Sequence, residues 1–215
     1  MTRLRAAKSL TVESLDKAKR VAVDLLRETR RRQKDCRYVD LRIEIAESKS
    51  ACAENGVEKA AQEDYLFSFG IRVLAGDRLP SPGYYGRRLS SADLPHLTTI
   101  LRDGFKHAYD RAKEHTKKQF KILGESLTGL TLAPIEVRQD TIKAECSVDP
   151  RSVPLSEVSR QTVDVSRAVK SLGARIKFNA ISTSTGLSRE LFTSSEGALI
   201  DQSFATTLGF CWVVA

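Results

Sequence analysis

The feature that most constrains this chain is a long run of alternating side chains near its C-terminal end. Residues 194–215 begin with Ser-Ser-Glu-Gly, and Gly197 supplies the backbone freedom that a chain reversal needs. Side chains two positions apart share one face of an extended strand. We therefore predict a turn followed by a long strand, with a mainly apolar, even-numbered face made of Ile200, Phe204, Thr206, Leu208, Phe210, Trp212 and Val214.

A similar pattern occurs earlier in the chain. Asn55-Gly56 favours a tight hairpin turn, because both central residues of such a turn need a positive φ, and the apolar stretch 66–75 follows. Gly56 lies nineteen residues before Ala75, and Gly197 lies eighteen residues before Ala215. The two segments align almost without a gap, which predicts an approximate internal repeat.

Three segments carry the apolar stripe of an amphipathic helix. The first extends from Thr11 to about Lys34, and the second is capped by Ser90 or Ser91, with Asp93 in a capping box, and persists to about Leu123. The third follows the proline-rich segment 149–154 and ends at Gly173.

The predicted fold class is α+β, with two repeated helix-plus-antiparallel-sheet units and the long second helix between them. The first unit spans residues 1–123, and a Gly-, Ser- and Thr-rich linker spans 124–134. The second unit is predicted to span 135–215 and to be cut off in its last strand.

Shorter patterns predict the remaining elements. Alternation predicts strands at 39–46, 57–61, 66–75, 176–180 and 188–193, with a further short strand between 135 and 148. Turn-forming residues predict an exposed loop at 80–86, which could contact a ligand, and a turn at 182–186.

Charge and targeting signals place few limits on the function. The net charge of +8 and the basic run from Arg27 to Arg37 fit either a solvated helix end or a nucleic-acid-binding patch. The N-terminus has no apolar signal region, and no window is apolar enough to span a membrane. We expect a soluble, cytoplasmic protein whose scattered cysteines stay reduced: Cys36, Cys52, Cys146 and Cys211.

The sequence offers no catalytic, cofactor-binding or metal-binding residues. None of the histidines, His96, His107 and His115, is followed by glutamate as in a zinc-peptidase helix. A serine or cysteine hydrolase using Ser194, Ser195 or a cysteine is an alternative, but no base is recognisable beside these residues. The Ser-Glu-Gly turn is better explained as structural.

Four motifs in a fixed order make the chain resemble the N-terminal part of the TldD/PmbA family, also called modulators of DNA gyrase. Each motif is weak alone, but together they cover about 180 residues, and their order and spacing match the family's. They are Val39-Asp40-Leu41-Arg42-Ile43-Glu44, Glu54-Asn55-Gly56, Gly70-Ile71-Arg72-Val73-Leu74 and Ser194-Ser195-Glu196-Gly197.

The resemblance implies a family of zinc metallopeptidases, hydrolases that act on small or unfolded peptides and form homo- or heterodimers around a chamber. The family's zinc site uses an H-E-x-x-x-H helix and a distant Cys, both C-terminal to the Ser-Glu-Gly strand. This chain lacks that helix, and Cys211 does not match the ligand. Zinc is therefore expected in a missing C-terminal part, and whether this chain is an enzyme stays open.

We thus expect the non-catalytic portion of a TldD/PmbA-type peptidase, which contributes chamber wall, dimer contacts and peptide-strand binding. A truncated chain, a gene fragment and a complete non-catalytic protein remain open. The alternative function is a basic module that binds nucleic acid or modulates gyrase. The strand at 199–215 is expected to leave an apolar sheet edge for a partner subunit to cover.

Overall fold

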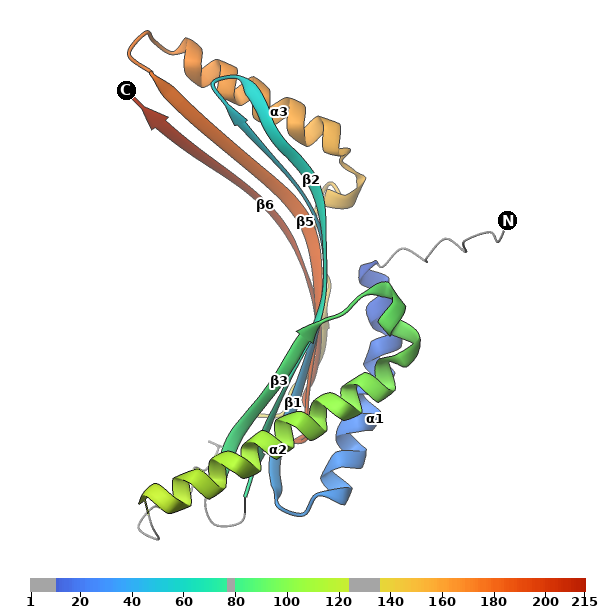
Figure 1. Ribbon diagram of the computed structural model, residues 1–215. Helices are drawn as coiled ribbons and strands as arrows, with labels where there is room; N and C mark the ends of the chain where they lie inside the picture. Colours follow the sequence, from blue (N-terminus) through green and yellow to red (C-terminus); the bar gives the residue numbers. More distant parts are fainter. Residues whose placement is uncertain (1–10, 77–79, 124–135) are drawn as a thin grey trace, which may run out of the picture. The chain divides into compact units, whose positions relative to one another are not determined.

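The fold combines three long helices with one mixed sheet, which confirms the α+β class (Figure 1). The computed structural model describes residues 11–76, 80–123 and 136–215, and of residues 30–32 it describes only the backbone. The expected linker at 124–134 therefore lies outside the described residues. The elements in chain order are η1 (Val12–Ser14), α1 (Leu15–Arg32), β1 (Cys36–Glu54), β2 (Val57–Ala75), β3 (Ser81–Arg88), η2 (Ser91–His96), α2 (Leu97–Leu123), β4 (Gln139–Ile142), η4 (Pro150–Ser152), α3 (Leu155–Ser171), β5 (Phe178–Ser194) and β6 (Leu199–Val214).

The six strands have the order β3-β2-β1-β5-β6-β4. β2 and β3 pair antiparallel, and β4 pairs parallel with β6. β1 and β5 run antiparallel, because the amide of Asn55 bonds to the carbonyl of Asn179 while that of Ser195 bonds to the carbonyl of Val39. Both predicted turns are confirmed: Asn55 has a φ of 50° and Gly56 of 83° between β1 and β2, and Gly197 has a φ of 103° between β5 and β6.

The residue contacts divide the chain into two compact units that do not follow the sequence in order. Unit 1 takes its described residues from 1–45, 67–142 and 190–202, and unit 2 takes them from 46–66, 143–189 and 203–215. The division at 124–134 and the internal repeat both stay predictions. No helix in the described part of the chain is long and apolar enough to cross a membrane.

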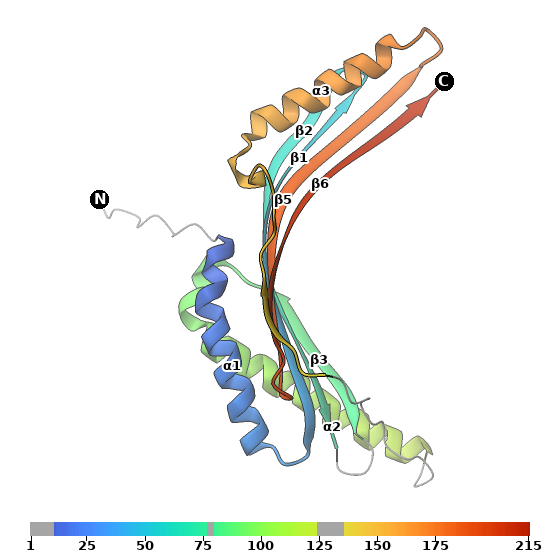
Figure 2. The same ribbon diagram turned by 180° about the vertical axis from the view of Figure 1, so that it is seen from behind.

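Unit 1 has a dense apolar core between its strands and two helices. Figures 1 and 2 show α1 and α2 on the same face of these strands. Odd-numbered side chains of the strands point toward the helices, because strand side chains alternate between faces. The buried apolar residues of this layer are Leu15, Ala18, Ala22, Leu25, Leu26, Val39, Leu41, Ile43, Ile45, Phe67, Phe69, Ile71, Val73, Leu97, Leu101, Phe105, Ala108, Ala112 and Leu191.

Three strands are longer than the sequence pattern predicts, and β1 covers residues 36–54 where the alternation predicts only 39–46. β2 is one continuous strand over residues 57–75, and β5 continues through 182–186, so the separate strands and the turn predicted there are wrong. Residues 58–64 of β2 are mostly exposed, and their side chains do not alternate between apolar and polar. In β5, the Thr185 hydroxyl lies 3.0 Å from the Thr207 hydroxyl of β6. A Cβ at Gly186 would lie 2.7 Å from the Glu47 carbonyl of β1.

The predicted loop at 80–86 is also wrong, because β3 occupies most of it. β3 is the edge strand beside β2, where the missing N–H of Pro82 is tolerated. Gly83 allows close approach of α2, since a Cβ there would lie 2.0 Å from the Ala108 carbonyl oxygen. Proline and glycine therefore mark an edge strand under a helix rather than a turn. The predicted Ser90 cap is confirmed, since the Ser90 amide donates to Asp93 at 2.7 Å.

Asp35 joins the turn after α1 to the middle of α2. Its carboxylate accepts a hydrogen bond from the Tyr109 hydroxyl at 2.6 Å and pairs with the Lys113 ammonium. Burial raises the pKa of Asp35, but the hydrogen bonds from Lys113 and Tyr109 outweigh burial, so the pKa lies below its usual value. The stability from this pair is therefore present above the unfolded-state pKa and is lost as pH falls through the folded-state pKa.

We expect Asp35→Asn to lower the free energy of unfolding by about 1–2 kcal/mol at neutral pH, because the partly buried ion pair is lost. The difference from the wild type should shrink near pH 3, and urea unfolding at both pH values measures it. Asp103→Asn, on the exposed side of α2, is the control and should change little. An equal loss at both pH values would contradict the role of the ionised carboxylate.

Candidate functional site

Unit 2 attaches its helix α3 to the sheet mainly through polar side chains. The Ser166 hydroxyl accepts from the Gly56 amide at 2.8 Å and donates to the Asn179 side chain at 2.5 Å. The Ser159 hydroxyl of α3 also donates to the Glu58 carboxylate. The Thr162 hydroxyl of α3 bonds to the Thr183 hydroxyl of β5. The buried apolar residues of unit 2, among those described, are only Ala51, Ala53, Pro150, Val158 and Ile181. The α3 side of this sheet therefore buries little apolar surface.

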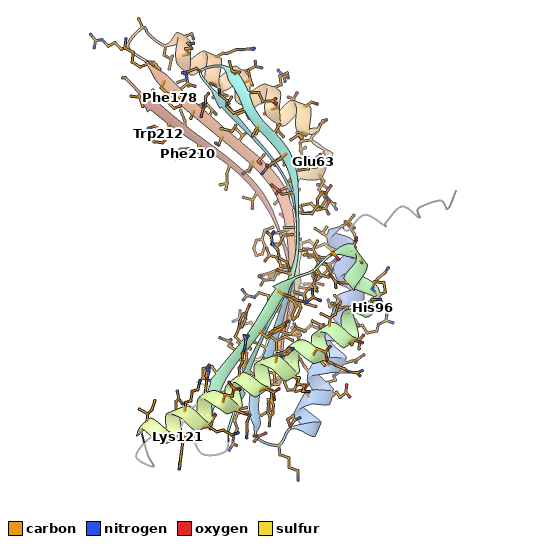
Figure 3. The ribbon with its side chains drawn as sticks, viewed as in Figure 1. Glu63, His96, Lys121, Phe178, Phe210 and Trp212 are labelled. Atoms are coloured by element: carbon orange, nitrogen blue, oxygen red, sulfur yellow. The ribbon has the colours of Figure 1, made fainter. Side chains whose placement is uncertain are left out.

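The large apolar side chains of unit 2 lie on the opposite face of the sheet. The Thr185–Thr207 pair puts odd-numbered residues of β5 and β6 on one face, and Thr183 shows that this is the α3 face. The even-numbered residues of β6 therefore point away from α3, and Figure 3 shows Phe210 and Trp212 on that side. We call this surface the apolar face; its exposed fractions are Phe204 48%, Leu208 63%, Phe210 66%, Trp212 61% and Val214 44%.

The outer edge of β6 is also open along residues 204–214. β4 pairs only with residues 199–202 of β6, and no further strand in the described part of the chain pairs beyond that point. The Val214 carbonyl accepts from the Lys177 amide, so even-numbered residues bond toward β5 and odd-numbered ones point outward. Residues 202–215 contain no charged side chain. Charges and prolines normally protect such an edge.

The other edge of the sheet, β3, is closed by α2. The Arg111 guanidinium donates to the Tyr84 carbonyl at 2.7 Å, and His115 Nδ1 lies 2.8 Å from the Pro82 carbonyl. Pro82 itself has no N–H to offer a further strand. The contrast indicates that the open β6 edge is a specific feature, which can accept an extended segment through main-chain hydrogen bonds.

The predicted serine site is structural. The Ser194 hydroxyl accepts from the amides of Glu196 and Ala198, both at 3.3 Å, and the Ser195 hydroxyl accepts from the Val39 amide at 3.0 Å. A hollow of about 420 Å³ beside this turn is lined by residues 193–199, α1 and Gln139, and none of its lining residues is a histidine. The arrangement lacks a base for a serine nucleophile.

The histidines and cysteines do not gather into a site. His96 is exposed at the end of η2, directly before α2 (Figure 3), while His107 stacks on Tyr85. All four cysteines are free thiols, and burial raises the pKa of Cys36 to about 11, with a smaller contribution from Asp35. In the described ranges, no group of three or more His, Cys, Asp or Glu side chains could hold a metal ion. Zinc in a further segment stays a prediction.

The basic run 27–37 spreads over the end of α1 and the start of β1. Arg27 lines the hollow beside the Ser194 turn, and Arg37 donates to the Gly76 carbonyl at 3.5 Å. The side chains of residues 30–32 lie outside the described part. The described part of the run therefore includes one backbone anchor, and a nucleic-acid-binding role of the run stays a prediction.

Two of the sequence motifs meet on the face of unit 1 that α1 and α2 leave uncovered. The Arg72 guanidinium donates to the Asp40 carboxylate at 2.8 Å, and lies 5.8 Å from the centre of the Tyr38 ring. Burial and the charge of Asp40 raise the pKa of Tyr38 to about 12. Arg42 pairs more loosely with Glu190 at 3.5 Å, beside a hollow of about 420 Å³. The motif residues thus join neighbouring strands.

Sequence reasoning found the apolar face from its alternation. It missed the polar attachment of α3, because the serines and threonines of α3 sit among ordinary helix residues. It also missed the closed edge of β3, which depends on contacts between Arg111, His115 and distant carbonyls. Neither feature has a local sequence signal.

Comparisons with known proteins agree on the fold. No protein-family model matches the chain, and no curated relative matches it. A protein described as a modulator of DNA gyrase from Thermotoga maritima matches over 89% of this chain and 38% of its own, with 12% identity and a TM-score of 0.52.

TldE from Thermococcus kodakarensis matches over 90% of this chain and 42% of its own, with 9% identity and a TM-score of 0.50. The chain thus spans about two fifths of the length of these solved structures. It has the fold of one part of a TldD/PmbA-type protein, which confirms at the level of the fold the resemblance predicted from its motifs.

Proposed function

We propose that this chain is the non-catalytic portion of a TldD/PmbA-type zinc metallopeptidase and that it pairs with another subunit of that type through β6. The observation that carries the proposal is the open, uncharged edge of β6 beside the exposed apolar face. The fold likeness to TldE supports a partner of this type, and the partial coverage supports a role as one portion of a larger protein.

The amount of apolar surface supports pairing. Aromatic side chains bury about 150–250 Å² each, so the exposed fractions of the apolar face amount to roughly 550 Å² per chain. A standard stable interface buries about 800 Å² per partner, and main-chain pairing along β6 would supply the remainder. No charged side chain on residues 202–215 opposes the approach of a second copy.

In this proposal the chain forms chamber wall and subunit contacts, while catalysis belongs to a zinc centre outside these residues. An extended peptide is a second occupant of the same edge, because main-chain pairing does not depend on sequence. Modulation of gyrase is not needed to explain any contact in the two units.

Sedimentation of the purified full chain, combined with metal analysis and a peptide-cleavage assay, tests the proposal. We expect a concentration-dependent dimer, because interfaces of this size bind in the micromolar range or tighter. We also expect neither stoichiometric zinc nor cleavage. A monomer at about 100 μM would refute the pairing. Stoichiometric zinc or peptide cleavage would refute the non-catalytic assignment and leave the pairing result standing.

A further inference from the structure

The hollow beside Arg42, on the face of unit 1 that α1 and α2 leave uncovered, collects residues of two sequence motifs. Its lining residues come from the four neighbouring strands β3, β2, β1 and β5. They include Asp40, Arg42 and Glu44 of one motif and Gly70 and Arg72 of another. Its volume of about 420 Å³ lies within the range of sites that bind small ligands. We call it the motif hollow.

A glycine in the floor of the motif hollow lets an aromatic ring lie close to the sheet. A Cβ at Gly70 would lie 2.6 Å from the Tyr84 hydroxyl oxygen, and a Cβ at Gly86 would lie 2.7 Å from the same atom. Tyr84 therefore lies across bare backbone of β2 and β3, and it remains 60% exposed. Phe192 of β5 lines the hollow on the other side of β1. Aromatic rings thus bound the hollow from both outer strands.

The charges around the motif hollow leave one carboxylate without a cation. Arg72 Nε donates to the Asp40 carboxylate at 2.8 Å, and Arg42 Nε lies 3.5 Å from the Glu190 carboxylate. Both arginines are therefore neutralised by an acidic partner. The Glu44 carboxylate has no ion-pair or hydrogen-bond partner among the described residues. The hollow therefore attracts a cation, and it would repel a carboxylate.

The unpaired polar atoms of the hollow match the donors of an ammonium group. Besides the Glu44 carboxylate, the side-chain hydroxyls of Ser68 and Tyr84 have no hydrogen-bond partner within the described part of the chain. Ser68 and Gly70 are two positions apart, so Ser68 lies on the same face of β2 as the glycine floor. An ammonium group has three N–H donors and no acceptor. The aromatic rings add cation–π attraction.

We propose that the motif hollow binds the N-terminal residue of a peptide. Its α-ammonium donates to Glu44, Ser68 and Tyr84. Arg42, whose contact with Glu190 is loose, donates to the first carbonyl oxygen of the peptide. The first side chain packs against the ring of Tyr84 or Phe192. All of these residues belong to unit 1, so the site is independent of the proposed pairing through β6.

Isothermal titration of the full chain with the tripeptide amide Phe-Ala-Ala-NH₂ at pH 6.5 tests the inference. At this pH the α-amine is protonated, because its usual pKa is about 7.7–8.0. N-acetylation of the peptide removes the ammonium and should weaken binding at least tenfold, because hydrogen bonds to charged groups are lost. Equal binding of the acetylated peptide, or no binding of the free one, would overturn the site. If n-butylamine binds as tightly as the peptide, the hollow takes any primary amine and the peptide assignment is wrong.

Glu44→Gln should weaken binding of the free peptide at least tenfold, because it removes the carboxylate that no cation neutralises. The matched control is Glu63→Gln, which removes the same charge from an exposed position of β2 in unit 2 (Figure 3). The control should bind as well as the wild type. Tyr84→Phe keeps the ring but removes one acceptor, and should weaken binding about threefold or more. Unchanged binding by Glu44→Gln, or an equal loss in Glu63→Gln, would show that the motif hollow is not the site.

Discussion

Replacing Phe210 and Trp212 together with lysine is expected to convert the full chain from a dimer to a monomer. Both side chains are more than 60% exposed on the apolar face, so the change removes two aromatic anchors without disturbing a buried core. Such anchors contribute about 2 kcal/mol or more each at an interface, which predicts a dissociation constant raised at least about 1,000-fold. In a dimer, the new lysines at positions 210 and 212 of one chain would also repel those of the other chain. Sedimentation velocity over a range of concentrations measures the change.

The control is Val165→Lys with Leu172→Lys, which adds the same charge to unit 2. These residues are 47% and 79% exposed and belong to α3 and its C-cap, away from the apolar face. The control variant should still dimerise. Loss of dimer in both variants would show that added charge, and not the apolar face, decides association. A dimer that survives Phe210→Lys with Trp212→Lys would refute the assigned surface.

Gly83→Ala is expected to destabilise unit 1 by about 3 kcal/mol or more. The new Cβ would lie 2.0 Å from the Ala108 carbonyl oxygen and 2.5 Å from the Ala112 amide nitrogen. These are backbone atoms of α2, so the clash cannot be relieved by a rotamer change, and the helix must move away from β3. Overpacking of this kind typically costs 1–3 kcal/mol and sometimes more. Urea unfolding followed by circular dichroism measures the loss.

Gly209→Ala is the matched control, because a Cβ at Gly209 meets no atom within 4 Å and the residue also lies in a strand. Its free energy of unfolding should stay within about 1 kcal/mol of the wild type, since Ala restricts the unfolded chain more than Gly does. Equal effects of the two substitutions would contradict the close approach of α2 to β3. They would restore the sequence-based interpretation of residues 80–86 as a loop.

The sequence predicts those parts of the fold that depend on local chemistry. Asn55-Gly56 and Gly197 specify turns through their positive φ, and the even-numbered residues of β6 identify a strand with one apolar face. The capping box at Ser90 is equally local. These features need no knowledge of the rest of the chain, so pattern reasoning found them.

The wrong predictions concern residues whose backbone conformation depends on a neighbouring helix or strand. Pro82 and Gly83 suggest a turn, but the edge position of β3 and the approach of α2 make them strand residues. The Ser, Thr and Gly residues at 182–186 likewise suggest a turn. They lie within β5, whose backbone pairs with the neighbouring strands β1 and β6. The sequence predicts both the apolar face and an open edge at β6. It does not predict how much of that edge is open, because this depends on where β4 stops.

Amide hydrogen exchange along β6 tests the proposed pairing most directly. In the single chain, even-numbered amides of residues 204–214 face β5, while those of Ala205, Thr207, Gly209, Cys211 and Val213 point outward. Pairing through this edge predicts that the five outward amides exchange quickly in dilute protein and become protected as concentration rises, while amides of α3 stay unchanged. If the outward amides remain unprotected in a sample that sedimentation shows to be dimeric, the edge is not the site of pairing.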